Sequence, residues 1–194
     1  MRPSRVFRWI VRLFLLVLTL SMTVVSVLGG MSAALILGNP DNIQIRPDLA
    51  QFSHNITDVN SMYLRVPFNI TNAGYFDLTN LKIDFKMSMV YDHVNLTGPG
   101  VNTTTSALIF DKSVNFPTIL HGMSYNGLFE TSNGDGFIAS NFPNVTTDID
   151  WTKTPYPVEF YSNFSLSAFY SLDLISFKLN AYNMSVGYLT IPPF

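Results

Sequence analysis

Hydrophobic and polar residues follow two different patterns along this chain of 194 residues, and the patterns divide it in two. No residue is charged between Leu13 and Leu37. From about residue 38 onward, apolar and polar residues mostly alternate with a period of two. A long apolar run predicts a membrane-spanning helix, whereas strict alternation predicts β-strands that bury one face.

The apolar run is long enough to cross a bilayer. A helix rises about 1.5 Å per residue, so residues 13–37 span roughly 37 Å, and the hydrocarbon core of a bilayer is about 30 Å thick. The basic residues before the run are Arg2, Arg5, Arg8 and Arg12, and the acidic residues soon after it are Asp41 and Asp48. Because basic flanks stay on the cytoplasmic side, we expect a cytoplasmic basic stub (1–12), a transmembrane helix in membrane lipid (13–37) and an extracytoplasmic domain (38–194) at the cell membrane.

A cleaved signal peptide is the competing interpretation, since Ser32-Ala33-Ala34 supplies small residues suited to cleavage. The apolar core of a signal peptide usually has about 7–15 residues, and here the run continues through Leu35-Ile36-Leu37. We therefore favour a retained signal-anchor. The pair Gly29-Gly30 could bend the helix or admit a close neighbour, but small residues are common in membrane helices and we favour that plainer explanation.

Alternation beyond residue 38 is clearest in Met62–Ile70, Leu81–Met89 and Val158–Leu166. Turn-forming sequences separate the runs, as at Asn72-Ala73-Gly74 and Asn133-Gly134-Asp135-Gly136. The expected strands lie near residues 42–50, 61–71, 79–91, 105–116, 119–131, 157–170 and 173–190. About seven strands without an amphipathic helix predict one all-β domain, an antiparallel β-sandwich.

Asparagine is abundant, and seven asparagines start an Asn-X-Ser/Thr sequence. They are Asn55, Asn69, Asn95, Asn102, Asn144, Asn163 and Asn183. The motif marks glycan attachment on exported proteins, although a domain rich in Asn, Ser and Thr also produces it by chance. Asn69 and Asn163 fall on the polar faces of their expected strands, so a glycan there would point to solvent. We expect several of these sites to be glycosylated.

Charge and cysteine content exclude several classes of function. After position 40 the chain has seven basic and thirteen acidic residues, a formal charge of −6. This argues against a nucleic-acid partner, which would require a basic surface. Cysteine is absent, so the domain has no disulfide, no thiolate metal site and no cysteine redox chemistry. Roughly 155 residues suffice to bury a core without such links.

Candidate catalytic and metal-binding residues are weakly patterned. The three histidines are His54, His93 and His121, and none has a second His or Glu three or four residues later. The segments Asp148-Ile149-Asp150 and Asn133-Gly134-Asp135 offer oxygen ligands for Ca²⁺ but lack the length of a calcium loop. We interpret all of these as ordinary surface or turn residues.

Sequence signatures of enzymes and nucleotide-binding proteins are also missing. The chain has no Gly-x-Ser-x-Gly elbow, P-loop or dinucleotide fingerprint. Ser124 follows His121 in HGMSYNG, but nothing marks it as activated. We therefore expect no enzyme activity and assign no catalytic, cofactor-binding or metal-ligating residue. Tyr161 and Phe169 stand on a face expected to be polar, where they could form a partner surface or pack into the core.

One segment resembles a known family. Residues Val66 to Met87 form a strand, the turn Asn69-Ile70-Thr71-Asn72-Ala73-Gly74, and a strand of the form Leu-x-Ile-x-Phe-x-Met. This resembles the LEA14-like domain (WHy, late embryogenesis abundant type 2), although the family's frequent Asn-Pro-Asn lacks its proline here. The resemblance implies an Ig/fibronectin-like sandwich associated with desiccation stress, defence or lipid handling, and it supplies no catalytic residues.

The sequence thus predicts a non-enzymatic single-pass membrane glycoprotein. Its external β-sandwich would serve interaction or structure, as a cell-surface protein or as an accessory subunit with a protein partner in a membrane assembly. The alternative is a LEA14-like lipid-handling or stress-protective module, which a large apolar groove would favour. An enzyme is the third possibility, and convergent polar side chains in a pocket would favour it.

Overall fold

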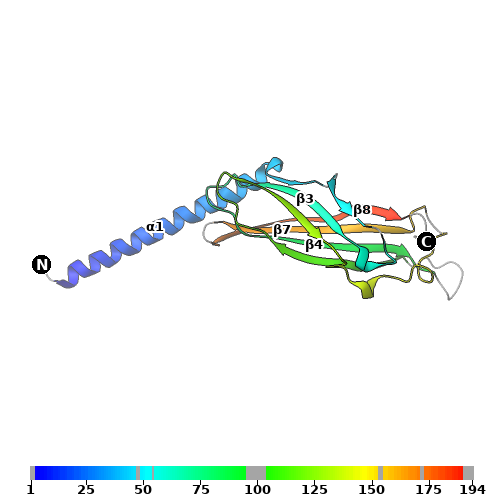
Figure 1. Ribbon diagram of the computed structural model, residues 1–194. Coiled ribbons are helices and arrows are strands. Elements are labelled where there is room, and N and C mark those ends of the chain that lie inside the picture. The colour runs from blue at the N-terminus through cyan, green and yellow to red at the C-terminus, as the bar shows by residue number, and fades with distance from the viewer. Residues whose placement is uncertain are drawn as a thin grey trace.

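A computed structural model describes residues 3–46, 49–53, 55–94, 104–152, 155–170 and 173–189. A long helix projects from one end of a β-domain (Figure 1). The regular elements are α1 (Pro3–Gly38), β1 (Ile43–Ile45), β2 (Gln51–Phe52), β3 (Leu64–Thr71), β4 (Thr79–Asp92), β5 (Thr104–Asn115), β6 (Ser124–Thr131), β7 (Val158–Tyr170) and β8 (Ile175–Leu189), with short 3-10 turns between some of them. The helix includes a segment of 30 residues, Trp9–Gly38, that is long and apolar enough to cross a membrane.

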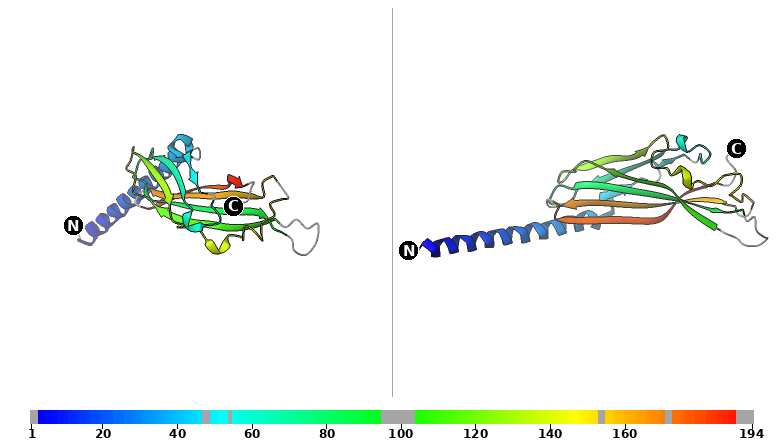
Figure 2. Two further views of the ribbon diagram at one scale, coloured as in Figure 1. Left: turned by 45° about the vertical axis from the view of Figure 1, so that its right-hand side comes forward. Right: turned by 90° about the horizontal axis from the view of Figure 1, so that it is seen from below.

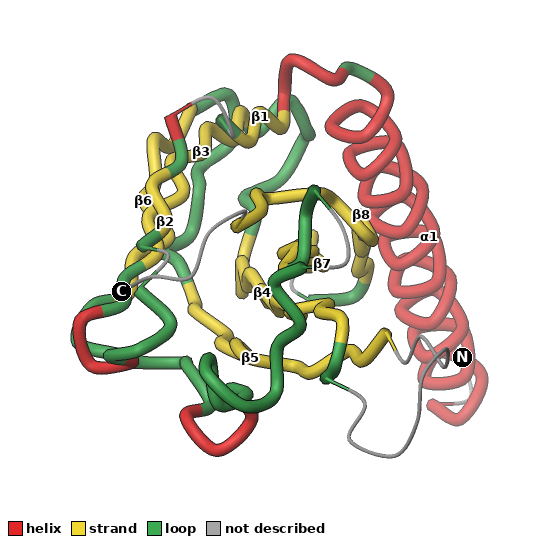
Figure 3. Tube along the Cα trace, turned by 90° about the vertical axis from the view of Figure 1, so that its right-hand side faces the viewer, coloured by secondary structure: helices red, strands yellow, loops and turns green. Residues whose placement is uncertain are grey.

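The strands form two four-stranded antiparallel sheets. In the first sheet, β3 pairs with β1 and β2 along one edge and with β6 along the other. The second sheet has the order β5-β4-β7-β8. Seen along the strands, the sheets enclose a common interior, and α1 runs beside β8 (Figure 3). The predicted all-β antiparallel sandwich after one N-terminal helix is confirmed.

The period-two pattern places apolar side chains between the sheets. In β3 and β4, every second residue from Leu64 to Ile70 and from Leu81 to Met89 is buried. Phe85 of β4 packs against Phe129 of β6, with ring centroids 5.7 Å apart. These contacts join the two sheets, as expected for residues that alternate between a core face and a solvent face.

Two of the expected strands are shorter in the structure. The run 42–50 forms a strand only at β1, Ile43–Ile45. Leu49, expected to face the core, is 54% exposed, whereas Asn42, expected to face solvent, is buried and donates to the carbonyl oxygen of Leu35. That bond satisfies a carbonyl at the end of α1, which otherwise has no helical partner.

The run 119–131 becomes a strand only at Ser124. The preceding residues form a turn closed by a 3.0 Å hydrogen bond from the Met123 amide to the Leu120 carbonyl. Gly122 has φ +72° in this turn, a conformation that favours glycine and interrupts strand geometry.

The last turns of α1 belong to the core of the β-domain. Gly29, Ser32 and Ile36 are buried, and they recur at the spacing of one helical face. Ile36 is part of the same hydrophobic cluster as the strand residues. The helix continues unbroken through Gly29-Gly30. Of the pair, Gly29 is buried and Gly30 is exposed, with nothing within 4 Å of a Cβ built at Gly30.

The loop between β3 and β4 forms the joint with the helix. Asn72 is fully buried, and its amide nitrogen donates to the carbonyl oxygens of Phe76 and Ile119. Its side-chain oxygen accepts from the Gly74 amide and from the Tyr170 hydroxyl at 2.8 Å. Every polar atom of this buried side chain is thus satisfied, which fixes the loop against the sandwich.

Candidate functional site

A polar groove of about 490 Å³ lies on the outer face of the β5-β4-β7-β8 sheet. Its charged lining residues are Lys82, Asp84 and Lys86 from β4, Asp111 from β5 and Lys178 from β8. Polar and aromatic residues complete the lining, namely Ser113, Asn163, Phe164, Ser165, Asn180 and Tyr182. The solvent-facing positions of four neighbouring strands therefore meet in one surface, because side chains two residues apart on a strand share a face.

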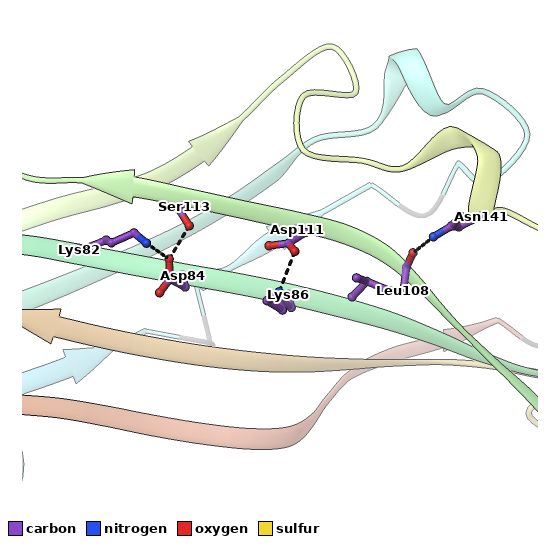
Figure 4. Close-up of polar contacts among 7 residues, drawn as sticks. All are labelled: Lys82, Asp84, Lys86, Leu108, Asp111, Ser113 and Asn141. Carbon is purple, nitrogen blue, oxygen red and sulfur yellow. Dashed lines mark hydrogen bonds and ion pairs between the residues drawn. The ribbon is translucent and has the colours of Figure 1, made fainter.

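Asp84 is at the centre of the charged lining. Its carboxylate lies 2.9 Å from the Lys82 ammonium and accepts a hydrogen bond from the Ser113 hydroxyl (Figure 4). Partial burial alone would raise the pKa of Asp84, but the hydrogen bonds from Ser113 and Lys82 and the charge of Lys178 outweigh it, so the pKa lies below its ordinary value. Asp84 is therefore ionised at neutral pH.

A second ion pair lies two residues further along β4. The Lys86 ammonium is 2.7 Å from the Asp111 carboxylate on β5 (Figure 4). That hydrogen bond and the negative charge of Asp111 raise the pKa of Lys86. Further along β5, the carbonyl oxygen of Leu108 accepts a hydrogen bond of 2.7 Å from the side chain of Asn141, which lies in a 3-10 turn. Leu108 is next to the point where the register between β4 and β5 shifts.

The groove is more positive than the domain around it. Three lysines and two aspartates line it, whereas residues after position 40 carry a formal charge of −6. Exposed ion pairs contribute little to stability, typically 0–1 kcal/mol. Their side chains can exchange partners at low cost, so the groove can accept a polar or acidic surface.

Two further features of the groove concern its hydrogen bonding. The hydroxyl oxygen of Ser165 is buried and has no hydrogen-bond partner among the described residues. The Asn163 side-chain oxygen accepts from the Asn183 amide at 2.9 Å. Both asparagines begin glycosylation sequences, so a glycan on Asn163 would start within the groove lining.

The other described glycosylation sites predicted from the sequence are at least partly exposed. Asn55, Asn144 and Asn183 are exposed, and Asn69 is partly exposed between buried neighbours on β3. In Asn55 and Asn144 the side-chain oxygen accepts from the hydroxyl of the threonine two residues later, at 2.7 Å in each case. Asn95 and Asn102 lie outside the described residues.

The two described histidines each contact a backbone carbonyl through Nδ1. His93 lies within 2.8 Å of the Val94 carbonyl through Nδ1, and the Nδ1 of His121 contacts the Gly74 carbonyl. His54 lies outside the described residues. In the described part of the chain, no group of three His, Cys, Asp or Glu residues is arranged to hold a metal ion.

The carboxylates of the two candidate calcium segments also have partners within the protein. Asp148 accepts from the Asn144 amide at 2.8 Å, and Asp150 accepts from the amide and hydroxyl of Thr152. Asp135 forms an ion pair with Lys112 at 2.5 Å. These carboxylates stabilise turns and stand apart from the groove.

The other residues considered from the sequence also have structural partners. The Ser124 hydroxyl lies 2.8 Å from the Thr71 hydroxyl. Tyr161 and Phe169 keep the expected alternation on β7 and are partly exposed on its outer face, where the Tyr161 hydroxyl donates to Glu159.

The alternation over Leu81–Met89 puts Lys82, Asp84 and Lys86 on one solvent face, but it does not identify the groove. The alternating charges Lys-x-Asp-x-Lys along β4 were the available signal. Their partners Asp111 and Lys178 come from β5 and β8, and only the order of strands in the sheet brings them together.

The chain was compared with known proteins. It matches no protein-family model and no curated protein. Among solved structures, it is similar to Spo0M, a sporulation control protein from Bacillus subtilis, with a TM-score of 0.34 and 15% sequence identity. The match covers 73% of this chain and 48% of that one, so this chain spans about half the length of Spo0M.

Proposed function

We propose that this chain is a single-pass membrane glycoprotein whose external β-sandwich is a non-enzymatic interaction or structural module. Its N-terminus is cytoplasmic and its sandwich lies outside the cell membrane, where the protein acts at the cell surface or as an accessory subunit of a membrane assembly. The sandwich meets its protein partner through the charged groove of the β5-β4-β7-β8 sheet, and the glycan expected on Asn163 is part of the surface that the partner recognises.

The observation that carries this proposal is the division of α1 into an exposed part and a docked part. Nearly all side chains from Trp9 to Leu28 are exposed, although most are apolar. Arg12 lies in this stretch, and the uncharged part from Leu13 to Leu28 spans about 24 Å, most of the roughly 30 Å of a bilayer's hydrocarbon core. The next turns, through Ser32 and Ile36, are buried against the sandwich. A bilayer around the exposed part would leave the domain directly at the membrane surface.

The docked turns also support a retained anchor over a cleaved signal peptide. Cleavage after Ala34 would remove Ser32, whose hydroxyl accepts a hydrogen bond from the Tyr75 amide. It would also leave Ile36, which is 1% exposed, on a short unfolded end. A buried apolar side chain and a buried hydrogen bond are features of a mature domain.

The chemistry of the groove favours protein interaction over lipid handling. Its lining is charged and polar, whereas a site for lipid chains would be apolar. The lipid-handling role implied by the LEA14-like resemblance is therefore the second proposal. The polar side chains that converge in the groove, among them the Ser113 hydroxyl that donates to Asp84, make enzyme activity the third proposal.

Native purification of the full chain in mild detergent, followed by mass spectrometry, tests the proposal. We expect a protein partner with the unaltered chain and its loss when Lys82→Glu and Lys86→Glu are combined. The control is Arg65→Glu on β3, outside the groove. Arg65 forms an ion pair of 2.6 Å with Glu130, so this substitution, like those at the two lysines, replaces a basic side chain next to a carboxylate with an acidic one. Equal recovery of the partner with the groove variant would contradict the assigned surface, and bound lipid without a protein would favour the second proposal.

The anchor has a separate test. We expect the mature protein to keep its original N-terminus and to remain in the membrane after carbonate extraction. A mature N-terminus near Leu35 would show that the segment is a cleaved signal.

A further inference from the structure

Four large apolar side chains are exposed on the loops at the helix end of the sandwich. The exposed fractions are 48% for Tyr75, 54% for Leu120, 58% for Met123 and 50% for Leu174. They come from three different loops, which connect β3 to β4, β5 to β6, and β7 to β8. Single exposed apolar side chains are normal on a protein surface. Here, however, three neighbouring loops at the helix end of the sandwich all expose large apolar side chains, which together form one apolar surface.

Hydrogen bonds show that these loops surround the point where α1 meets the domain. The Tyr75 amide donates to the Ser32 hydroxyl of the helix. The Asn72 amide donates to the Met123 carbonyl oxygen, and the Gly122 amide donates to that of Asn72. The turn with Leu120 and Met123 is therefore tied to the loop that contacts the helix, and Figure 2 shows the helix leaving the sandwich at the end where these strands turn.

The turn between β5 and β6 holds its two apolar residues side by side. Leu120 and Met123 occupy its first and last positions and are joined by a 3.0 Å hydrogen bond from the Met123 amide to the Leu120 carbonyl oxygen. Gly122 supplies the positive φ that the turn requires. Both side chains are more than half exposed, so a fixed backbone presents a small apolar tip.

Leu174 is held at the same end by the β7–β8 turn. The preceding residue, Asp173, accepts hydrogen bonds from the side chains of Thr79 and Asn80 at the start of β4. Next to this turn, Tyr170 at the end of β7 bonds to Asn72. The buried side chain of Asn72 therefore ties the first two loops to Tyr170, and the exposed bonds of Asp173 hold the β7–β8 turn to the start of β4 at the same end.

We propose that this end of the sandwich rests on the outer surface of the bilayer, with Leu120, Met123, Tyr75 and Leu174 inserted among the lipid headgroups. The inference rests on the proposed function, in which α1 spans that bilayer. Counted from Leu13, the first residue after Arg12, twenty helical residues span about 30 Å and end at Ser32, so Ser32 lies at the edge of the hydrocarbon core. Tyr75, bonded to Ser32, is then at headgroup depth, where tyrosine is enriched in membrane proteins.

The charge of the loops favours a lipid surface without net negative charge. Residues 72–78, 119–123 and 173–174 contain no lysine or arginine, and their two carboxylates, Asp77 and Asp173, accept hydrogen bonds within the protein. Attraction to anionic lipid requires basic residues. The occupant is accordingly a zwitterionic lipid surface, bound by insertion of apolar side chains.

Single cysteines can test this directly, because the chain has none of its own. Full-length Leu120→Cys and Met123→Cys are labelled with an environment-sensitive fluorophore and reconstituted in phosphatidylcholine vesicles. Nitroxide-bearing lipids then report whether each probe lies in the headgroup region. The matched control is Leu128→Cys on β6, which is 46% exposed but lies five residues further along the strand, about 16 Å away. Leu18→Cys within α1 reports on the anchor separately.

We expect headgroup nitroxides to quench the probes at positions 120 and 123 at least threefold more than the probe at 128. Nitroxides deep in the acyl chains should quench the probe at 18. Quenching at 18 without preferential quenching at 120 and 123 would overturn the inference and leave the anchor intact. Loss of quenching at 18 would overturn the membrane-spanning function, and this inference with it.

Discussion

The hydroxyl of Ser32 accepts a hydrogen bond of 2.8 Å from the backbone amide of Tyr75, and so joins the helix to the sandwich. The same hydroxyl donates to the Leu28 carbonyl oxygen one turn earlier, also at 2.8 Å. Ser32 is fully buried, so these bonds are protected from water and add to the packing of Ile36. The helix is thus docked as part of the domain, without a swivelling linker.

Gly74 should be essential for this docking. A Cβ atom at this position would lie 2.7 Å from the Ser32 Cβ and 2.9 Å from the Tyr170 ring. We expect Gly74→Ala to lower the free energy of unfolding by about 1–3 kcal/mol, as overpacking of a core does. Denaturant unfolding of the full chain in detergent micelles measures the change.

The control for Gly74→Ala is Gly30→Ala on the helix. A Cβ at Gly30 meets nothing within 4 Å, and alanine has the higher helix propensity. This variant should be neutral or slightly stabilising. Equal losses at the two glycines would contradict the close approach at Gly74.

Phe68 and Phe85 should dominate the core of their strands. Phe68 packs edge-on against Phe116 with ring centroids 4.8 Å apart, and Phe85 packs against Phe129. Truncating either phenylalanine to alanine should cost about 3–5 kcal/mol. The full chain is the proper sample for denaturant melts, because Ile36 of the helix belongs to the same core.

Lysines on the opposite face of β4 provide the contrast. The ammonium groups of Lys82 and Lys86 form ion pairs, and the two side chains are 44% and 49% exposed. Replacing either with alanine should cost less than about 0.5 kcal/mol, in the range of surface substitutions. If the lysine variants were as unstable as the phenylalanine ones, the assignment of the two faces would be wrong.

Asn69 and Asn163 should both carry glycans in native material. Each lies on the outer side of its strand between buried neighbours, where an attached sugar would reach solvent. Mass spectrometry of intact glycopeptides checks the two sites. Asn144, which is exposed in a turn, is the internal reference. A glycan on Asn144 but on neither strand site would count against modification on strand faces. No glycan at any of the three sites would count against the export route.

The stability of the domain should fall in acid through Asp84. The hydrogen bonds from Ser113 and Lys82 outweigh the effect of burial, so folding lowers the pKa of Asp84 below its ordinary value of 3.8. A carboxylate with a lowered folded-state pKa contributes stability above the unfolded value, and that contribution is lost as pH falls through the folded value. Asp84→Asn should therefore flatten the stability profile below about pH 4. An unchanged slope in urea melts between pH 5 and pH 2 would refute this assignment.

The length and polarity pattern of the sequence determined which elements form. Strands at 61–71, 79–91 and 157–170 were predicted nearly to their ends, because each buries one face and period two follows directly from strand geometry. The apolar run before them predicted a helix for the same kind of reason. Local turn chemistry at Asn72-Ala73-Gly74 correctly separated β3 from β4.

Only the tertiary structure decided how these elements meet. Ser32 and Ile36 look like ordinary residues of a membrane helix, yet packing places them in the core of the β-domain. Lys86 meets Asp111 because β4 lies beside β5, and the Leu120–Met123 turn is tied through Asn72 to the loop that contacts the helix. Such relationships depend on strand order and on contacts between distant residues, whereas periodicity reports only which face of each element is buried.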